Sequence, residues 1–264
     1  MNQEKAAALL KRIGIETIPL KSNGSKAGEK DAQTLEVLIR GYLEHVPFEN
    51  LDVFDAGRIP VLEEDALFEK IVEKRRGGYC FELNTLLGHL LEALGFSWYP
   101  VAVRVLWNRE NIPPVSHMGI VVPMDKNCYY CDVGFGGPGP KGLLELSEKA
   151  QTIAGESFLV HLMQDRDIRI DRQQDNTWKP LLQFRNLPVR NVDFQIMNYY
   201  CATHPDVLFT QKRVVNICTP NGSKALTDME LTVRDNGCIR QETYHSPEEL
   251  AAGLEKEFGI QNCL

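Results

Sequence analysis

The chain has 264 residues, of which 43% are hydrophobic and 25% charged. These values are ordinary for a globular protein and exclude a disordered, collagen-like or coiled-coil chain. The 29 basic and 36 acidic side chains give a net charge of −7, which argues against electrostatic binding of nucleic acid. No run of about 18 apolar residues is present, so we expect no membrane-spanning helix.

The N-terminus and the cysteines predict the compartment. The opening MNQEKAAALLKRIG lacks the basic segment and apolar block of a signal peptide. The seven cysteines are odd in number and irregularly spaced. Together these features predict reduced thiols in a cytoplasmic protein.

Apolar residues at helical spacing predict four helices in the first 95 residues. The first stops at Gly14, the third ends before Gly77, and the fourth is followed by Gly95, where a helix often ends. The four stripes are Leu9, Leu10 and Ile13; Leu35, Leu38, Ile39 and Tyr42; Leu67 and Ile71; and Leu83, Leu86, Leu87, Leu90, Leu91 and Leu94.

From Trp98 onward the apolar period changes to that of a strand. Alternation predicts a strand over 99–107 and two more over 118–122 and 128–135. Short strands and polar connections should continue to about residue 195.

The last third of the chain predicts a small mixed α/β unit. Strand-like segments cover 212–218 and 225–235, and Asn236-Gly237 is a hairpin-turn signal. Ser246, with proline next and Glu249 three residues later, predicts the start of a C-terminal helix.

Cys80 is the first candidate for chemistry, because it stands at the start of the longest predicted helix, within RRGGYCFELN. A helix N-terminus has a partial positive charge and free N–H groups, which stabilise a thiolate and can donate to an oxyanion. The alternative is that Cys80 is a small buried hydrophobic residue.

A nucleophilic cysteine needs a base, and the base needs an orienting group. His117 starts one predicted strand and Asp132 ends the next. If the chain turns between Met124 and Asp125, His117 and Asp132 lie directly opposite on one face of a hairpin. A purely structural His–Asp pair at the end of a sheet is the alternative.

Several other features have ordinary explanations. Residues 134–139 fit G-x-G-x-x-G, but the Pro-Lys-Gly that follows opens a helix poorly. Cys128 and Cys131 should point to opposite faces of a strand, which disfavours a metal or redox site. Glu49 and Arg76 could form a buried ion pair or could both be solvated.

Four motifs then resemble one known family. HVPFEN, RGGYCFELN, SHM and DVGFG, in this order and spacing, resemble the arylamine N-acetyltransferases, and the resemblance covers nearly the whole chain. It implies an α+β multidomain fold with a cysteine-protease-like Cys-His-Asp core. The expected parts are an N-terminal helical bundle (1–94), a central antiparallel β-barrel (95–195) and a C-terminal α/β lid with its helix (196–264).

The resemblance also implies roles for single residues. Cys80, His117 and Asp132 would be the catalytic triad, Arg76 and Glu49 a buried ion pair near it, and Phe48 part of the acceptor pocket. In the lid, the family pattern Asn-x-Tyr…Ser-Thr-Ser-Pro-x-Ser-x-Phe is kept in outline over 198–209, although its serines are lost and Asp206 appears. By this match Tyr200 and Thr203 would contact the cofactor. Ala202, His204, Asp206 and the pair Pro113-Pro114 are departures near the expected cofactor site.

The function implied is acetyl transfer from acetyl-CoA to arylamines, arylhydroxylamines or hydrazines through an acetyl-cysteine, with no metal, nucleic acid or membrane involved. A thiol hydrolase or transglutaminase-like enzyme could use the same triad. A binding module with a vestigial triad is the non-enzyme alternative. The sequence leaves the acceptor, the acyl-chain preference and the oligomeric state open.

Overall fold

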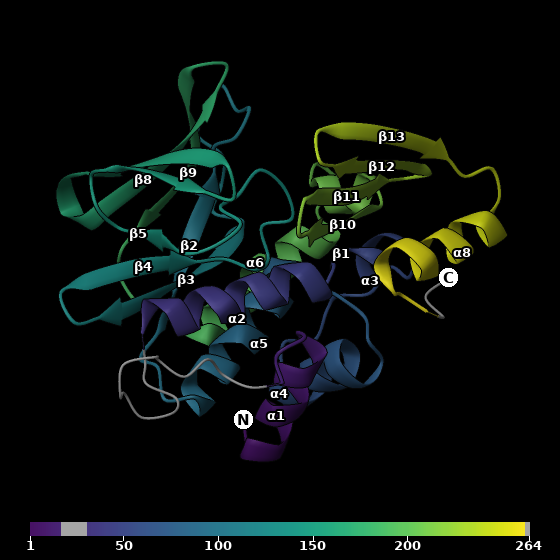
Figure 1. The fold of residues 1–264 in the computed structure, drawn as a ribbon, viewed down its shortest axis with the longest axis horizontal. Coiled ribbons are helices and arrows are strands. Elements are labelled where there is room, and N and C mark those ends of the chain that lie inside the picture. Colours follow the sequence, from purple (N-terminus) through teal and green to yellow (C-terminus); the bar gives the residue numbers. More distant parts are fainter. Residues whose placement is uncertain (17–30, 262–264) are drawn as a thin grey trace.

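The computed structural model describes residues 1–16 and 31–261, and its elements follow the order predicted from the sequence (Figure 1). The helices are α1 (Gln3–Arg12), α2 (Ala32–His45), α3 (Leu51–Phe54), α4 (Glu64–Phe68), α5 (Cys80–Ala93), α6 (Phe194–Thr203), α7 (Leu208–Gln211) and α8 (Pro247–Phe258). The strands are β1 (Phe48–Glu49), β2 (Tyr99–Val105), β3 (His117–Met124), β4 (Asn127–Cys131), β5 (Leu144–Glu145), β6 (Ala150–Ile153), β7 (Glu156–Leu162), β8 (Asp167–Gln174), β9 (Thr177–Arg185), β10 (Val214–Thr219), β11 (Gly222–Thr227), β12 (Glu230–Asp235) and β13 (Cys238–Thr243).

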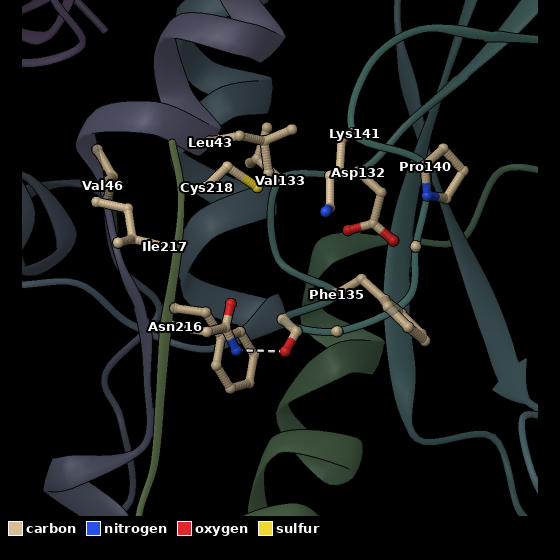
Figure 2. Close-up of a pocket in the computed structure, with 14 residues that line it drawn as sticks. Leu43, Val46, Asp132, Val133, Phe135, Pro140, Lys141, Asn216, Ile217 and Cys218 are labelled. Carbon is tan, nitrogen blue, oxygen red and sulfur yellow. Dashed lines mark hydrogen bonds between the residues drawn. The ribbon is translucent and has the colours of Figure 1, made fainter. Parts of the chain in front are cut away.

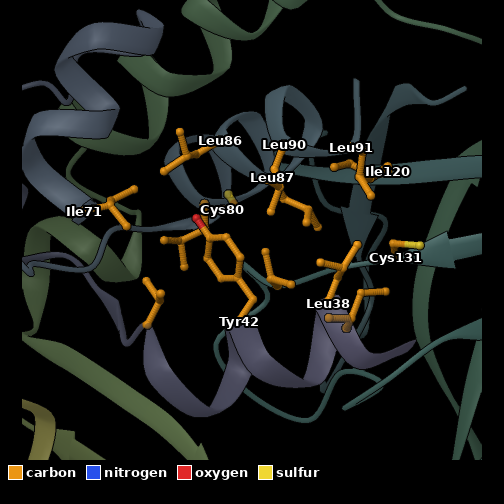
Figure 3. Packing of buried hydrophobic residues seen from close by; sticks show 14 of the residues in the cluster. Leu38, Tyr42, Ile71, Cys80, Leu86, Leu87, Leu90, Leu91, Ile120 and Cys131 are labelled. Atoms are coloured by element: carbon orange, nitrogen blue, oxygen red, sulfur yellow. The ribbon is translucent and has the colours of Figure 1, made fainter. Parts of the chain in front are cut away.

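Helix α5 runs through the first hydrophobic core, between α2 and the strand β3. Figure 3 shows Leu38 and Tyr42 of α2 facing Leu87 and Leu90 of α5, with Ile120 of β3 beside them. Nearly every side chain of α5 is buried, which explains why its leucine stripe is the broadest in the sequence. The N-terminal end of α5, which bears Cys80, is therefore held on several sides.

Strands β2 to β9 form an eight-stranded antiparallel sheet in the order β5-β4-β3-β2-β9-β8-β7-β6. The sheet curves until its edge strands meet. Where they meet, the Gln151 side chain of β6 hydrogen-bonds both the N–H and the C=O of Glu145 in β5, at 2.9 and 2.7 Å. A second hydrophobic core fills its interior. The predicted barrel-like middle is thus a nearly closed sheet.

The second sheet has the order β1-β10-β11-β12-β13. Its first strand comes from the N-terminal part of the chain, since Phe48 pairs with Asn216. The segment 225–235 is two strands rather than one, because the chain turns at Asp228 with a φ of 53°. Helix α8 lies beside this sheet (Figure 1) and buries its apolar face there.

Other sequence predictions have clear outcomes. The C-terminal helix is confirmed, with the Ser246 hydroxyl accepting from the Glu249 N–H at 3.2 Å. Helix α6 was not predicted, because one of its few buried positions is the polar Asn198, which interrupts any apolar stripe. Residues 134–139 lead to β5 and not to a helix. No helix among the described residues is long and apolar enough to cross a membrane. The three domain boundaries stay predictions.

Candidate active site

Cys80 is the first residue of α5 and is 2% exposed. The backbone N–H groups of Phe81 and Met118 lower the pKa of its thiol. The loop after β4 approaches so closely that a Cβ on Gly134 would lie 2.6 Å from the Cys80 Cα, which only glycine allows. The thiol is therefore buried among backbone donors at a helix N-terminus, a place that can stabilise negative charge.

His117 and Asp132 form a short contact, with 2.6 Å between Nε2 and Oδ2 and side-chain exposures of 5% and 1%. They meet diagonally and not directly opposite, because Val121 pairs with Tyr130 and Gly119 is in line with Asp132. The predicted register is wrong by two, since the chain turns one residue later than expected. A shift of two keeps side chains on the same face, so the imidazole and the carboxylate still meet.

The same part of the prediction placed a strand over 128–135, but β4 ends at Cys131. Asp132 therefore lies in the loop that follows, and its carboxylate is held by donors from three elements. Oδ1 accepts from the Asn84 amide at 2.9 Å and from the Gly134 N–H at 3.0 Å, and Oδ2 accepts from the Tyr130 phenol at 2.8 Å.

These contacts decide the charge state of Asp132. Burial alone would raise the pKa of its carboxyl, but the charge of His117 and the donors around it lower that pKa below its ordinary value. Cys80 is affected in the opposite direction. Burial, followed by the nearby Cys201, raises the pKa of its thiol, and the N–H groups of Met118 and Phe81 only partly oppose this. A thiolate here needs a proton acceptor close by.

Cys80 and His117 line one cavity of about 660 Å³. Phe48 lines it too, together with Phe135 and Phe209, so the residue expected in an acceptor pocket does face the thiol's cavity. The edge of the Phe135 ring meets the His117 ring at a centroid distance of 5.4 Å. The cavity thus offers flat apolar walls next to a candidate nucleophile.

The two expected cofactor contacts behave differently. Tyr200 lines the cavity, as do Pro113, Pro114 and Asp206. Thr203 does not, because it is exposed and its hydroxyl donates to the Tyr199 carbonyl one turn back along α6, at 2.7 Å. The structure brings only Tyr200 of this pair to the site.

A small second cavity of about 30 Å³ lies beside Asp132 (Figure 2). Asp132, Phe135 and Lys141 face it, and the Asn216 amide closes one side by donating to the Gly136 carbonyl. This volume holds about one or two water molecules. It shares Phe48, Phe135, Gly136 and Gly137 with the lining of the large cavity, so the two spaces are neighbours.

Glu49 and Arg76 are an ion pair, with Glu49 1% exposed and 2.8 Å between the Arg76 guanidinium and Oε1. The solvated alternative is wrong. The pair is part of a larger cluster of charged side chains. In this cluster the Lys70 ammonium lies 2.7 Å from Glu82 and 2.6 Å from Asp52. Glu82 in turn accepts from the Tyr79 N–H at the start of α5, at 3.1 Å.

Sequence reasoning missed the residues that surround the candidate triad. Asn84 could have been found, because it follows Cys80 by four residues and so shares its helix face. Lys70, Asp52 and Tyr130 carry no comparable signal. Cys128 packs against the barrel core and Cys131 lies in the helical core, as their predicted opposite faces require.

Comparison with known proteins defines the class. Residues 31–262 match the N-acetyltransferase family. The chain is 30% identical over 257 residues to the arylamine N-acetyltransferase of Mycolicibacterium smegmatis, covering 95% of this chain and 90% of that protein. It is 31% identical to that of Escherichia coli, covering 90% and 85%. The chain belongs to the arylamine N-acetyltransferase family.

Solved structures agree with this assignment. The enzyme from Salmonella typhimurium superimposes with a TM-score of 0.89 at 26% identity, covering 98% of this chain and 92% of that one. The Mycobacterium marinum enzyme in complex with CoA gives a TM-score of 0.84 at 26% identity, covering 97% and 92%.

Proposed function

We propose that this protein moves an acetyl group from acetyl-CoA to an aromatic amine, hydroxylamine or hydrazine through an acetyl-Cys80 intermediate. One observation carries the proposal most: a buried cysteine at a helix N-terminus shares a cavity with His117, whose imidazole lies 2.6 Å from the Asp132 carboxylate. Family membership supports the same chemistry.

The first half-reaction forms the acetyl-enzyme. Asp132 occupies Nε2 of His117, which leaves Nδ1 to accept the Cys80 proton. The transfer forms a thiolate–imidazolium pair and leaves the net charge of the site unchanged. Attraction between the two charges offsets the cost of burying the thiolate. The thiolate attacks the thioester carbonyl, backbone N–H groups near Cys80 stabilise the oxyanion, and CoA leaves with the proton from His117.

The second half-reaction returns the enzyme to its starting state. The acceptor nitrogen attacks the acetyl-cysteine carbonyl, His117 takes the proton that the nitrogen loses, and the Cys80 sulfur leaves. An aromatic amine suits the step because it is neutral and nucleophilic at pH 7. Phe48, Phe135 and Phe209 supply apolar walls for a flat ring.

The large cavity that Cys80 lines is the candidate binding site for acetyl-CoA. A relative in this family is known in complex with CoA, and here Tyr200 and the segment 107–114 line the same cavity as the three phenylalanines. We assign Tyr200 and 107–114 to the donor and the three phenylalanines to the acceptor ring. A cytoplasmic location, argued from the odd and irregularly spaced cysteines, belongs to the same proposal.

The test is intact mass after mixing with acetyl-CoA in the absence of an acceptor. We expect one acetyl mass on Cys80 and a burst of one equivalent of CoA, followed by slow release. Cys80→Ser should show neither, whereas Cys238→Ser, which removes an exposed thiol, should behave as wild type. An arylamine should then discharge the acetyl group rapidly.

Other outcomes point elsewhere. Acetylation that only aliphatic amines discharge would contradict the acceptor class. Absence of acetylation, with rapid cleavage of esters or peptides, would support the thiol hydrolase. Alkylation of Cys80 by iodoacetamide with a pH midpoint near 8.5, the value of a free thiol, would indicate a vestigial triad.

A further inference from the structure

Tyr130 contacts the same carboxylate oxygen as His117. Its phenol oxygen lies 2.8 Å from Asp132 Oδ2, and His117 Nε2 lies 2.6 Å from that atom. We propose that Tyr130 is a positioning residue for the reaction, whose hydrogen bond keeps Asp132 ionised and turned toward His117. This inference rests on the proposed triad and extends it by one residue.

The Tyr130 ring is fixed in place by the barrel core. The side chain is fully buried and stacks on Phe184 of β9 with ring centroids 5.2 Å apart and an interplanar angle of 23°. On its other side lies Gly119 of β3, where a Cβ would come within 2.5 Å of the phenol oxygen. The ring can occupy this position only because residue 119 has no side chain.

The division of donors gives Tyr130 a distinct role. Asn84 and the Gly134 N–H both bond Oδ1, the oxygen that faces away from His117. Tyr130 is the donor that shares Oδ2 with the imidazole. Burial, followed by the charge of Asp132, raises the pKa of Tyr130 well above its ordinary value, so the phenol keeps its proton and donates. A donor to the charged form lowers a carboxyl pKa.

Several titratable groups surround Asp132. His117 faces it from β3, Tyr130 from β4 and Cys80 from α5. Cys131 precedes it in the chain, and Lys141 faces the small cavity that Asp132 also lines. None of these other groups is altered when the Tyr130 hydroxyl alone is removed, so the comparison isolates one hydrogen bond.

A purely structural explanation exists, since buried hydroxyl groups nearly always find a partner. It predicts that removing the hydroxyl changes only stability. The positioning role predicts a change in pH dependence: without one donor the Asp132 pKa rises, so the carboxylate is protonated, and orients His117 less well, at higher pH than in the wild type.

The experiment compares Tyr130→Phe with Tyr129→Phe. Tyr129 is the neighbour on the other face of β4, and its phenol accepts only a long 3.4 Å contact from Asn127 near the surface. For Tyr130→Phe we expect the acid limb of kcat/KM for acetyl-CoA to move up by about 0.5–1 pH unit. We also expect kcat to fall by roughly 3–20-fold with KM for the amine unchanged. Tyr129→Phe should match the wild type in both.

The outcomes separate this inference from the proposed function. If wild-type protein fails to acetylate Cys80, the proposed function itself is wrong. If the wild type acetylates normally and the acid limb of Tyr130→Phe stays in place or moves down, only the role of Tyr130 is wrong. Loss of melting temperature without a pH shift would assign Tyr130 to packing alone and would also overturn the proposal.

Discussion

Two His–Asp pairs lie on the same eight-stranded sheet. His117 and Asp132 are nearly fully buried, whereas His161 and Asp171 join β7 and β8 with 3.0 Å between Nε2 and Oδ2 and with 34% of the imidazole exposed. The second pair is also diagonal, because Leu159 is the residue paired with Asp171. The hairpin geometry that brings a histidine to an aspartate is thus common to both.

The difference lies in what else touches the carboxylate. Arg169 binds Asp171 through two nitrogens, at 2.9 and 3.2 Å, and neutralises its charge. Besides His117, Asp132 accepts hydrogen bonds only from uncharged donors, the Asn84 amide, the Tyr130 phenol and one N–H, among the described residues. Its negative charge therefore remains available to His117, and Cys80 lies in the same cavity as that histidine. The groups that touch the aspartate, more than the His–Asp contact itself, distinguish the candidate active site from the His161–Asp171 pair.

The largest expected effect separates the two aspartates. Asp132→Asn removes the charge that orients and stabilises an imidazolium, so kcat/KM for acetyl-CoA should fall on the order of 10³–10⁴-fold with the fold intact. Asp171→Asn should stay within about twofold of wild type, because neither His161 nor Asp171 lines the cavity of Cys80. Both variants are measured with one arylamine and checked by circular dichroism. Equal losses would show that the comparison is wrong.

The second effect concerns stability, and it contrasts a buried cation with an exposed one. Lys70→Met leaves the Glu82 carboxylate, 1% exposed, without its cation and should cost about 3–5 kcal/mol at pH 8. Lys74→Met removes the exposed partner of Glu69 and should cost at most about 1 kcal/mol. Melting temperatures of both variants against wild type are the measurement.

The pH dependence of the Lys70 variant follows from Glu82. Burial raises the pKa of Glu82 from 4.5 to about 7, although Lys70 opposes the shift. A carboxyl with a raised pKa binds its proton more tightly when folded, so its contribution to stability is greatest below 4.5 and is lost as pH rises through 7. The deficit of Lys70→Met should therefore be smaller at pH 5.5 than at pH 8. A deficit that grows on acidification would contradict this assignment.

The sequence alone predicted the helix that bears Cys80, the strand that begins at His117 and the residues of the candidate triad, because each follows from a local period or motif. It placed the hairpin turn one residue too early, and this shifts the predicted pairing register by two residues. Tertiary contacts decide where such a turn falls. Only the even shift preserved the His–Asp contact.

The residues that no pattern indicated act across the fold. Lys70 reaches Glu82 and Asp52 from the short helical segment Glu69–Glu73 that follows α4. Tyr130 reaches Asp132 only because Gly119, next to its ring, has no side chain. Such contacts depend on how elements pack, which a single sequence does not encode in any short window. The expected cofactor contact of Thr203 stays a prediction, and in the structure its hydroxyl donates to its own helix.

The smallest expected effect comes from removing the cation beside the His161–Asp171 pair, which leaves Asp171, like Asp132, without a charged arginine partner. Arg169→Met removes the cation from Asp171 and leaves that carboxylate, 5% exposed, to His161 alone. Because the arginine is one-third exposed, the free energy of unfolding should fall by about 1 kcal/mol or less. The loss should be smaller in high salt, because salt already screens the ion pair in the wild type. Activity should equal wild type, since neither His161 nor Asp171 lines the cavity that holds Cys80. Melting temperature at low and high salt, with kcat for an arylamine, measures both. A fall in kcat comparable to that of Asp132→Asn would mean that the two pairs are coupled through the sheet, and the neighbours of Asp132 would then not be sufficient to explain its role.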